Sequence, residues 1–178
     1  MTFNSELPST PLAGAKLGRR ALLVATLAAL FYMPNQALST VQQAQAAIKT
    51  VVPFKTGSWA QLLKKGPRPA AYVFTTTYCP TCPEAFEQLH AAVLEARKKV
   101  ELVAVVMDVQ GERALVHAHH YQGATRIYAF EGFEPEIRQS VDPKWPNVTP
   151  YVVLIGRTGL VQRSIGPPDA AQLKAWLD

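Results

Sequence analysis

The pattern of apolar and polar residues between positions 47 and 178 predicts short strands and helices in alternation. Residues 70–76 are rich in Tyr, Val, Phe and Thr, which predicts a buried strand. Residues 102–107 form a nearly continuous apolar run, typical of a strand covered on both faces. Further extended segments are predicted at 47–55, 125–130, 151–155 and 160–164. The last two flank a Gly156 to Gly159 turn signal, so we expect a hairpin there.

A helical period follows the first of these buried strands. From about position 79 to 99, apolar residues recur at helical spacing, namely Phe86, Leu89, Val93, Ala96 and Val100. Shorter helices are predicted at 58–65, 112–121, 134–141 and 168–177. This order of elements is of the α/β class, with parallel pairing early in the chain and a hairpin late.

The first 46 residues have the layout of an export leader. Lys16, Arg19 and Arg20 precede an apolar run at 21–33, and Ala44-Gln45-Ala46 offers a cleavage site. The apolar run of 13 residues is shorter than the 18 or so that span a bilayer. We therefore expect 1–46 to be a signal peptide, with an N-terminal anchor as the alternative. The arginine pair resembles a twin-arginine signal, but an ordinary secretory leader fits as well.

The remaining chain, 47–178, has the size of one domain with one core. Without the leader it keeps 15 basic and 12 acidic residues and a net charge of +3. This mild charge gives no reason to expect a nucleic-acid partner. We expect a monomer.

The chemistry is expected at Cys79-Pro80-Thr81-Cys82, which holds the only two cysteines of the chain. A disulfide that closes so small a loop stabilises a fold by only about 2 kcal/mol, so a structural role explains little. A helix that starts at the pair favours a thiolate through its free N–H groups and its dipole. Cys79 is then the attacking sulfur, and Cys82 resolves the mixed disulfide. A zinc site and an inert pair are the alternatives, but structural zinc needs four ligands and there is no second pair.

These motifs resemble the thioredoxin superfamily over nearly all of 47–178. The resemblance is carried by CPTC at a strand-to-helix junction, by Thr149-Pro150 before an apolar strand, and by the final hairpin and helix. An extra helix and strand at about 112–130 is similar to the insertion of the exported branch, the membrane-facing thiol reductases and the thioredoxins of cytochrome c maturation. The resemblance implies a central mixed sheet flanked by helices, with this insertion before a cis-proline loop.

The resemblance also implies roles for individual residues. Pro150 would be cis and face the cysteines, and the backbone of Thr149 would pair with a client strand. Tyr78, Pro80 and Thr81 would contact the client as well. No metal and no cofactor beyond the disulfide itself is implied. The partners would be protein thiols and disulfides, and a membrane protein would donate electrons.

Two positions depart from the family pattern. Tyr78 replaces the usual tryptophan before the first cysteine, and Val73 stands where classical thioredoxins carry a buried acid. Proton transfer at Cys82 then needs another group. Glu84 or Glu87 is the candidate, since the exported branch often uses a glutamate just past the motif, although acids are common in the first turn of any helix.

Two rival functions start from other residues. His117, His119 and His120, together with the thiolates, suggest a thioredoxin-like copper metallochaperone, although such proteins space their cysteines by three residues. Thr76, three residues before Cys79, matches part of the peroxiredoxin motif, but Tyr72 stands where that motif has a proline. We predict an exported thiol-disulfide oxidoreductase that acts on protein disulfides, as a reductase rather than an oxidase.

Overall fold

A six-stranded mixed sheet forms the centre of the computed structural model, which describes residues 48 and 50–178. The strand order is β1-β4-β3-β2-β5-β6. The four strands from β1 to β2 run parallel, and β5 and β6 complete the sheet in antiparallel fashion. The strands are β1 Val51–Phe54, β2 Ala70–Thr75, β3 Glu101–Val106, β4 Arg126–Phe130, β5 Tyr151–Ile155 and β6 Val161–Ile165.

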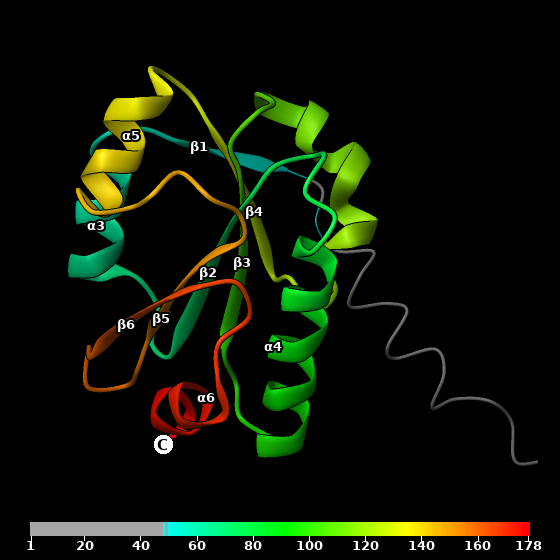
Figure 1. The fold of residues 1–178 in the computed structure, drawn as a ribbon, viewed down its shortest axis with the longest axis vertical. Coiled ribbons are helices and arrows are strands. Elements are labelled where there is room, and N and C mark those ends of the chain that lie inside the picture. Colours follow the sequence, from blue (N-terminus) through cyan, green and yellow to red (C-terminus); the bar gives the residue numbers. More distant parts are fainter. Residues whose placement is uncertain (1–47, 49) are drawn as a thin grey trace, which may run out of the picture. The chain divides into compact units, whose positions relative to one another are not determined.

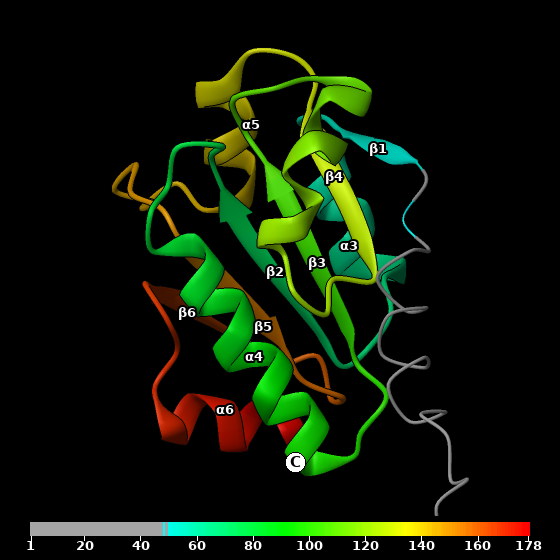
Figure 2. The ribbon, with the colours of Figure 1, turned by 90° about the vertical axis from the view of Figure 1, so that its right-hand side faces the viewer.

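Helices cover both faces of this sheet (Figure 1). On one face lie α3 (Ser58–Lys65) and α5 (Glu134–Val141); on the other lie α4 (Cys82–Ala96) and α6 (Ala170–Leu177). A 3-10 helix, η1 (Gly111–His120), lies on the α4 face, as Figure 2 shows. The predicted fold class, a thioredoxin-like sheet flanked by helices, is confirmed.

Strand β2 is buried along its whole length because it lies inside the sheet and both of its faces are covered. Since side chains alternate along a strand, Ala71 and Val73 join the core under α4, while Tyr72 and Phe74 join the core under α3 and α5. This double burial accounts for the unbroken apolar run in the sequence.

The boundaries of three predicted helices differ from the structure, among them the last, predicted at 168–177, which begins at Ala170. Helix α4 begins at Cys82 rather than at Cys79 and ends at Ala96, where Arg97 adopts a left-handed φ of 52°. Cys79 precedes Pro80, which disfavours helical backbone at Cys79, whereas Pro83 is tolerated in the first turn. The helix predicted at 112–121 is present as the 3-10 helix η1, one residue earlier; the apolar spacing does not separate the two kinds of helix.

The helix and strand predicted at about 112–130 are present as η1 and β4, and β4 lies between β3 and β1 in the sheet. The predicted leader, 1–46, lies outside the described residues. Within the described part of the chain, no helix combines the length and the apolar character needed to cross a membrane.

Candidate active site

The cysteine pair lies in the short connection between the end of β2 and the start of α4. Cys79 stands in the loop and Cys82 is the first residue of the helix, and a disulfide joins them. Cys79 is 9% exposed and Cys82 only 1%. Because a partner sulfur must approach in line with the bond it attacks, the greater exposure of Cys79 agrees with its predicted role as the attacking sulfur.

Hydrogen bonds from Cys79 and from Thr77 hold the loop that carries Cys79. The Cys79 N–H donates to the Thr76 carbonyl at 3.2 Å. The Thr77 N–H and hydroxyl both donate to the carboxylate of Asp108, which follows β3. The loop is thereby tied to the neighbouring strand, so Cys79 is positioned from the sheet as well as from the helix.

Thr81 provides a polar neighbour for the outer sulfur. Its Oγ1 lies 3.9 Å from the Cys79 Sγ, within reach of a weak sulfur hydrogen bond. The side chain makes no capping bond to α4, although Thr81 is the N-cap residue. Its hydroxyl is therefore free to donate to a thiolate on Cys79, which favours the charged form.

Two hollows flank the loop that precedes the disulfide. One, of about 260 Å³, contains both cysteines in its lining, together with Thr76, His120 and Tyr121 among others. The second, of about 470 Å³, is lined by Thr76, Tyr78, Asp108, Val148 and Thr149 among others. Thr76 and Tyr78 line both hollows, so the cysteines and Thr149 lie on either side of one short segment.

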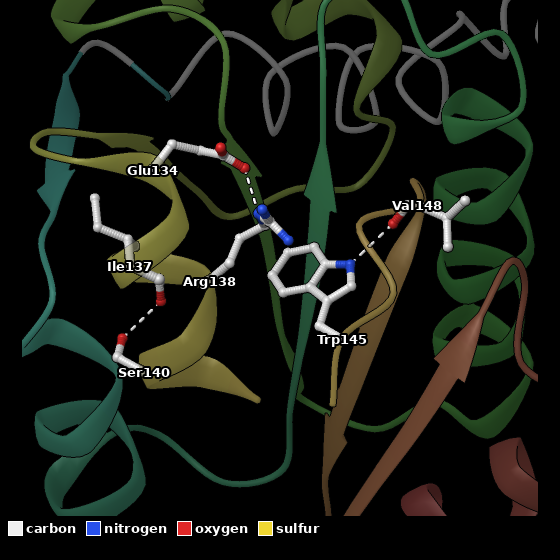
Figure 3. A network of polar contacts seen from close by, with 6 residues as sticks. All are labelled: Glu134, Ile137, Arg138, Ser140, Trp145 and Val148. Carbon is white, nitrogen blue, oxygen red and sulfur yellow. Dashed lines mark hydrogen bonds and ion pairs between the residues drawn. The ribbon is translucent and has the colours of Figure 1, made fainter. Parts of the chain in front are cut away.

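The loop that contains Thr149 is anchored from its own residues and from α5. The Thr149–Pro150 peptide bond is cis, and so is Arg68–Pro69, which the sequence analysis did not predict. The Trp145 indole N–H donates to the Val148 carbonyl at 3.0 Å (Figure 3). The guanidinium of Arg138, which pairs with Glu134, lies 6.0 Å from the centre of the Trp145 ring. In the same view the Ser140 hydroxyl donates to the Ile137 carbonyl within α5.

Asp142 connects this loop to β5 and β6. Its carboxylate accepts a hydrogen bond from the Tyr151 hydroxyl and another from the Lys144 N–H, and it pairs with Arg163 at 3.1 Å. The ring of Tyr151 stacks on Trp145 with centroids 4.3 Å apart. Burial works to raise the pKa of Asp142, but the Tyr151 and Lys144 bonds and the Arg163 charge hold it below its ordinary value. The carboxylate is therefore charged at neutral pH and fixes both ends of the cis-proline loop.

The structure brings most of the predicted client-binding residues together. Tyr78 is 77% exposed beside the disulfide, and Pro80 and Thr81 are exposed between the cysteines. Thr149 is half-buried beside Tyr78, and Pro150 is buried. Glu84 and Glu87, the predicted proton relay, are exposed on α4 and line neither hollow.

Residues that sequence reasoning missed lie around the same site. Asp108 and Tyr121 follow a strand and a helix far along the chain from Cys79, and no motif connects them to it. Their only sequence signal is position: Asp108 comes just after the predicted strand at 102–107, at the edge where β2 also ends.

The three histidines proposed for metal binding lie on η1. His120 lines the hollow beside the cysteines, and its ring lies 3.9 Å from that of His119 and 6.3 Å from that of His117. Partial desolvation and the neighbouring rings of His119 and His117 lower the pKa of His120. Across residues 48 and 50–178, no three His, Cys, Asp or Glu side chains gather in a way that could hold a metal ion.

Comparison with known proteins gives matches among solved structures alone. No family model and no curated protein matches the chain. A thioredoxin-related protein from Neisseria meningitidis serogroup B is 17% identical with a TM-score of 0.49, over 65% of this chain and 87% of that one. A putative thiol:disulfide interchange protein DsbE from Chlorobium tepidum is 21% identical with a TM-score of 0.47, over 66% and 85%. A secreted Mycobacterium tuberculosis disulfide oxidoreductase is 16% identical with a TM-score of 0.45, over 62% and 80%.

The sheet order, the helices on both faces and the cysteine pair between β2 and α4 are those of a thioredoxin-like protein, so the resemblance seen in the sequence is confirmed at the level of the fold. Two sulfurs three positions apart can exist as a dithiol or as a disulfide, so this pair is chemically able to form a redox couple.

The Asp142 cluster predicts a pH-dependent contribution to stability. A carboxyl whose folded pKa lies below its ordinary value of 3.8 stabilises the fold above that pH, and the contribution is lost as the pH falls through the folded pKa. We expect Asp142→Asn to lower the free energy of unfolding by about 1–2 kcal/mol at pH 7, as for the loss of a charged hydrogen bond.

Urea unfolding of the oxidised protein between pH 7 and pH 2 measures this effect, and the gap between wild type and Asp142→Asn should close at the acid end. Glu131→Gln, which removes a charge from an exposed pair with Lys55, is the matched control and should change stability by less than about 0.5 kcal/mol. A gap that stays constant down to pH 2 contradicts the assignment.

Proposed function

We propose that this protein is a thiol-disulfide oxidoreductase that acts on protein disulfides outside the cytoplasm and works as a reductase. The observation that carries the proposal is the disulfide between Cys79, the more exposed of the two residues at 9%, and Cys82, which is 1% exposed at the start of α4. The chain contains no other cysteine.

In the reduced state, the Cys79 thiolate attacks one sulfur of a client disulfide. The Cys79–client bond forms, the client S–S bond breaks, and the first client thiolate leaves and takes a proton. Cys82 then loses its proton and attacks the Cys79 sulfur, which closes the Cys79–Cys82 bond and releases the second client thiolate. The client gains two electrons and the protein ends as the disulfide.

The Cys79 thiolate is favoured by its surroundings. The first turn of α4 presents unpaired N–H groups and the positive end of the helix dipole toward the preceding loop. The Thr81 hydroxyl lies within reach of the Cys79 sulfur. These contributions act on Cys79 rather than on Cys82, which is enclosed in the core.

A client would bind along the hollow between Tyr78 and Thr149. The ladder between β2 and β5 ends at the Phe74–Tyr151 pair, so Thr149 lies just beyond it, where its backbone is placed to pair with an extended segment. Tyr78 and Val148 offer exposed apolar surface beside that position. Such a site recognises backbone and apolar side chains around a disulfide, which suits more than one client protein.

Export and reductase direction rest on the sequence. The basic residues and apolar run within 1–46 support export, and the cleaved form 47–178 would act there. A reductase outside the cytoplasm needs a dithiol donor across the membrane, because the surroundings are oxidising.

Substitution of each cysteine should separate their roles. Cys79→Ser should reduce insulin, with dithiothreitol as donor, no faster than dithiothreitol alone, because the attacking sulfur is missing. Cys82→Ser should also fail to turn over, but should accumulate a Cys79–client mixed disulfide, visible by mass spectrometry.

In Cys82→Ser, alkylation of Cys79 should titrate below the ordinary pKa of about 8.5. Thr81→Val is the milder comparison and should raise that midpoint. The proposal would be refuted if Cys79 titrated with the ordinary pKa of about 8.5, or if Cys79→Ser rather than Cys82→Ser accumulated the mixed disulfide with the client.

The reduction potential decides the direction of electron flow. A reductase should have a Cys79–Cys82 potential of about −250 mV or below, whereas a value near −120 mV would identify an oxidant. Equilibration with glutathione buffers, followed by trapping of the free thiols, measures it.

Cell fractionation tests the location. When the full-length chain is expressed in a bacterium with an outer membrane, we expect a periplasmic product with the mass of 47–178, while a chain that starts at residue 47 stays in the cytoplasm. Arg19→Lys combined with Arg20→Lys should block export only on the twin-arginine route. Retention of the full-length chain in the cytoplasm would be incompatible with the proposed location.

A further inference from the structure

The resolving cysteine poses a problem of proton transfer. Cys82 is 1% exposed, and a buried thiol resists ionisation because its charged form is poorly solvated. The residue that would carry an acid in classical thioredoxins is Val73, fully buried in the apolar core with Phe86. A thiolate on Cys82 therefore needs a polar group from elsewhere in the fold.

The hollow of about 260 Å³ beside the disulfide contains such groups. Besides the cysteines, its lining includes Thr76, at the end of β2, and Tyr121, which caps η1. Thr76 is 8% exposed and Tyr121 3%. The hydroxyl oxygens of both are buried, and neither makes a hydrogen bond of ordinary length and angle among the described residues; the Thr75 side chain is the neighbour that the Tyr121 hydroxyl approaches. A buried hydroxyl left unpaired costs about 1–3 kcal/mol, so two of them in one hollow call for a function or for bound water.

The ring of Tyr121 is held firmly against α4. It packs on Phe86, four residues after Cys82, with ring centroids 5.1 Å apart. Two residues further on, Gly123 has a φ of +72°, and a Cβ there would lie 2.3 Å from the His90 ring of α4. The chain after η1 therefore fits closely against α4, which keeps the Tyr121 hydroxyl at the hollow that Cys82 also lines.

We propose that the Tyr121 hydroxyl, together with Thr76 and water in this hollow, carries the proton to and from Cys82 in place of the missing buried acid. This rests on the proposed function and assigns a group to its second step. The hollow is large enough to hold water, and Thr76 and Tyr121 stand in its lining with their hydroxyl oxygens buried just beneath its surface.

The proton moves as the resolving bond forms. The Cys82 thiol gives its proton to the hydroxyl and water chain as its sulfur attacks the Cys79 sulfur, and a proton from the far end of the chain passes to solvent or to the departing client thiolate. Tyr121 begins and ends neutral. Burial raises the pKa of Tyr121 to about 12, and the carboxylate of Asp108 adds to the rise, which only the nearby Thr75 opposes. The Thr75 hydroxyl itself donates to the Thr76 carbonyl.

Several other ionisable groups lie near Cys82 or Tyr121. They include Cys79 and Tyr78 in the loop, Asp108 after β3, His120 on η1 and His90 on α4. Asp108 is exposed and lines the second hollow, which shares Thr76 and Tyr78 with the first.

A disulfide exchange in two observable steps tests whether Tyr121 acts in the second step alone. The full-length reduced protein is mixed with one equivalent of the aromatic disulfide dithio-bis-nitrobenzoate, whose thiolate is coloured. The first thiolate reports attack by Cys79 and the second reports resolution by Cys82. Removing a general acid or base that acts directly on the reacting group slows a step by about 10²–10⁴-fold. Since Tyr121 would act through a relay, we expect a smaller effect: Tyr121→Phe should slow the second release by at least about tenfold at pH 6.

The first release should stay unchanged in Tyr121→Phe, and the defect in the second should shrink toward zero as the pH rises and Cys82 ionises unaided. Thr76→Val should give a smaller defect with the same pH dependence. Tyr128→Phe, a buried tyrosine on the opposite face of the sheet, is the matched control and should change neither release.

Three outcomes would overturn the relay. The second release in Tyr121→Phe could stay within twofold of wild type at pH 6, or its slowing could be equal at all pH values. The third outcome is a slowed second release in His120→Gln, or in Glu84→Gln combined with Glu87→Gln, instead of in Tyr121→Phe. Failure of the first release in wild type would refute the proposed function itself, so the two failures are distinguishable.

Discussion

The interior position of β2 is the constraint on which the site depends. Its six residues pair with β3 on one side, five of them pair with β5 on the other, and both faces are covered by helices. A strand held in this way cannot shift its register without moving buried side chains to the wrong face. The point at which it ends is therefore fixed, and so is the loop that carries Cys79.

The two cysteines differ because they stand on opposite sides of a structural boundary. Cys79 belongs to the loop, where the Asp108 carboxylate holds the preceding Thr77 and the Thr81 hydroxyl reaches its sulfur. Cys82 belongs to α4 and faces the core. A single covalent bond thus joins an accessible sulfur to an enclosed one, and the difference in solvation supports one attacking and one resolving role.

Because position 73 is a valine and not an acid, the polar groups near the cysteines must come from other parts of the fold. The core on the α4 side is apolar up to the disulfide, and hydroxyls rather than carboxylates line the hollow beside it. On the other side of the loop, Asp142, Trp145 and Tyr151 hold the segment before β5 through a charged cluster and a stacked ring pair. The cis-proline loop is therefore set by contacts with α5 and β6 that are independent of the cysteines.

The sequence by itself determined the order of strands and helices, the cysteine pair and its place at a strand-to-helix junction. These follow from local periodicity, since apolar spacing and turn residues act within a few positions along the chain. Only the tertiary structure decided that helix α4 begins at Cys82, that Asp108 binds Thr77, and that Tyr121 reaches the hollow at Cys82. Those contacts join residues about 30 to 40 positions apart that carry no shared motif. The Asp108 contact arises because the parallel strands β2 and β3 end at the same edge of the sheet and bring the loops that follow them side by side, whereas Tyr121 is positioned by the packing of its ring on Phe86 of α4.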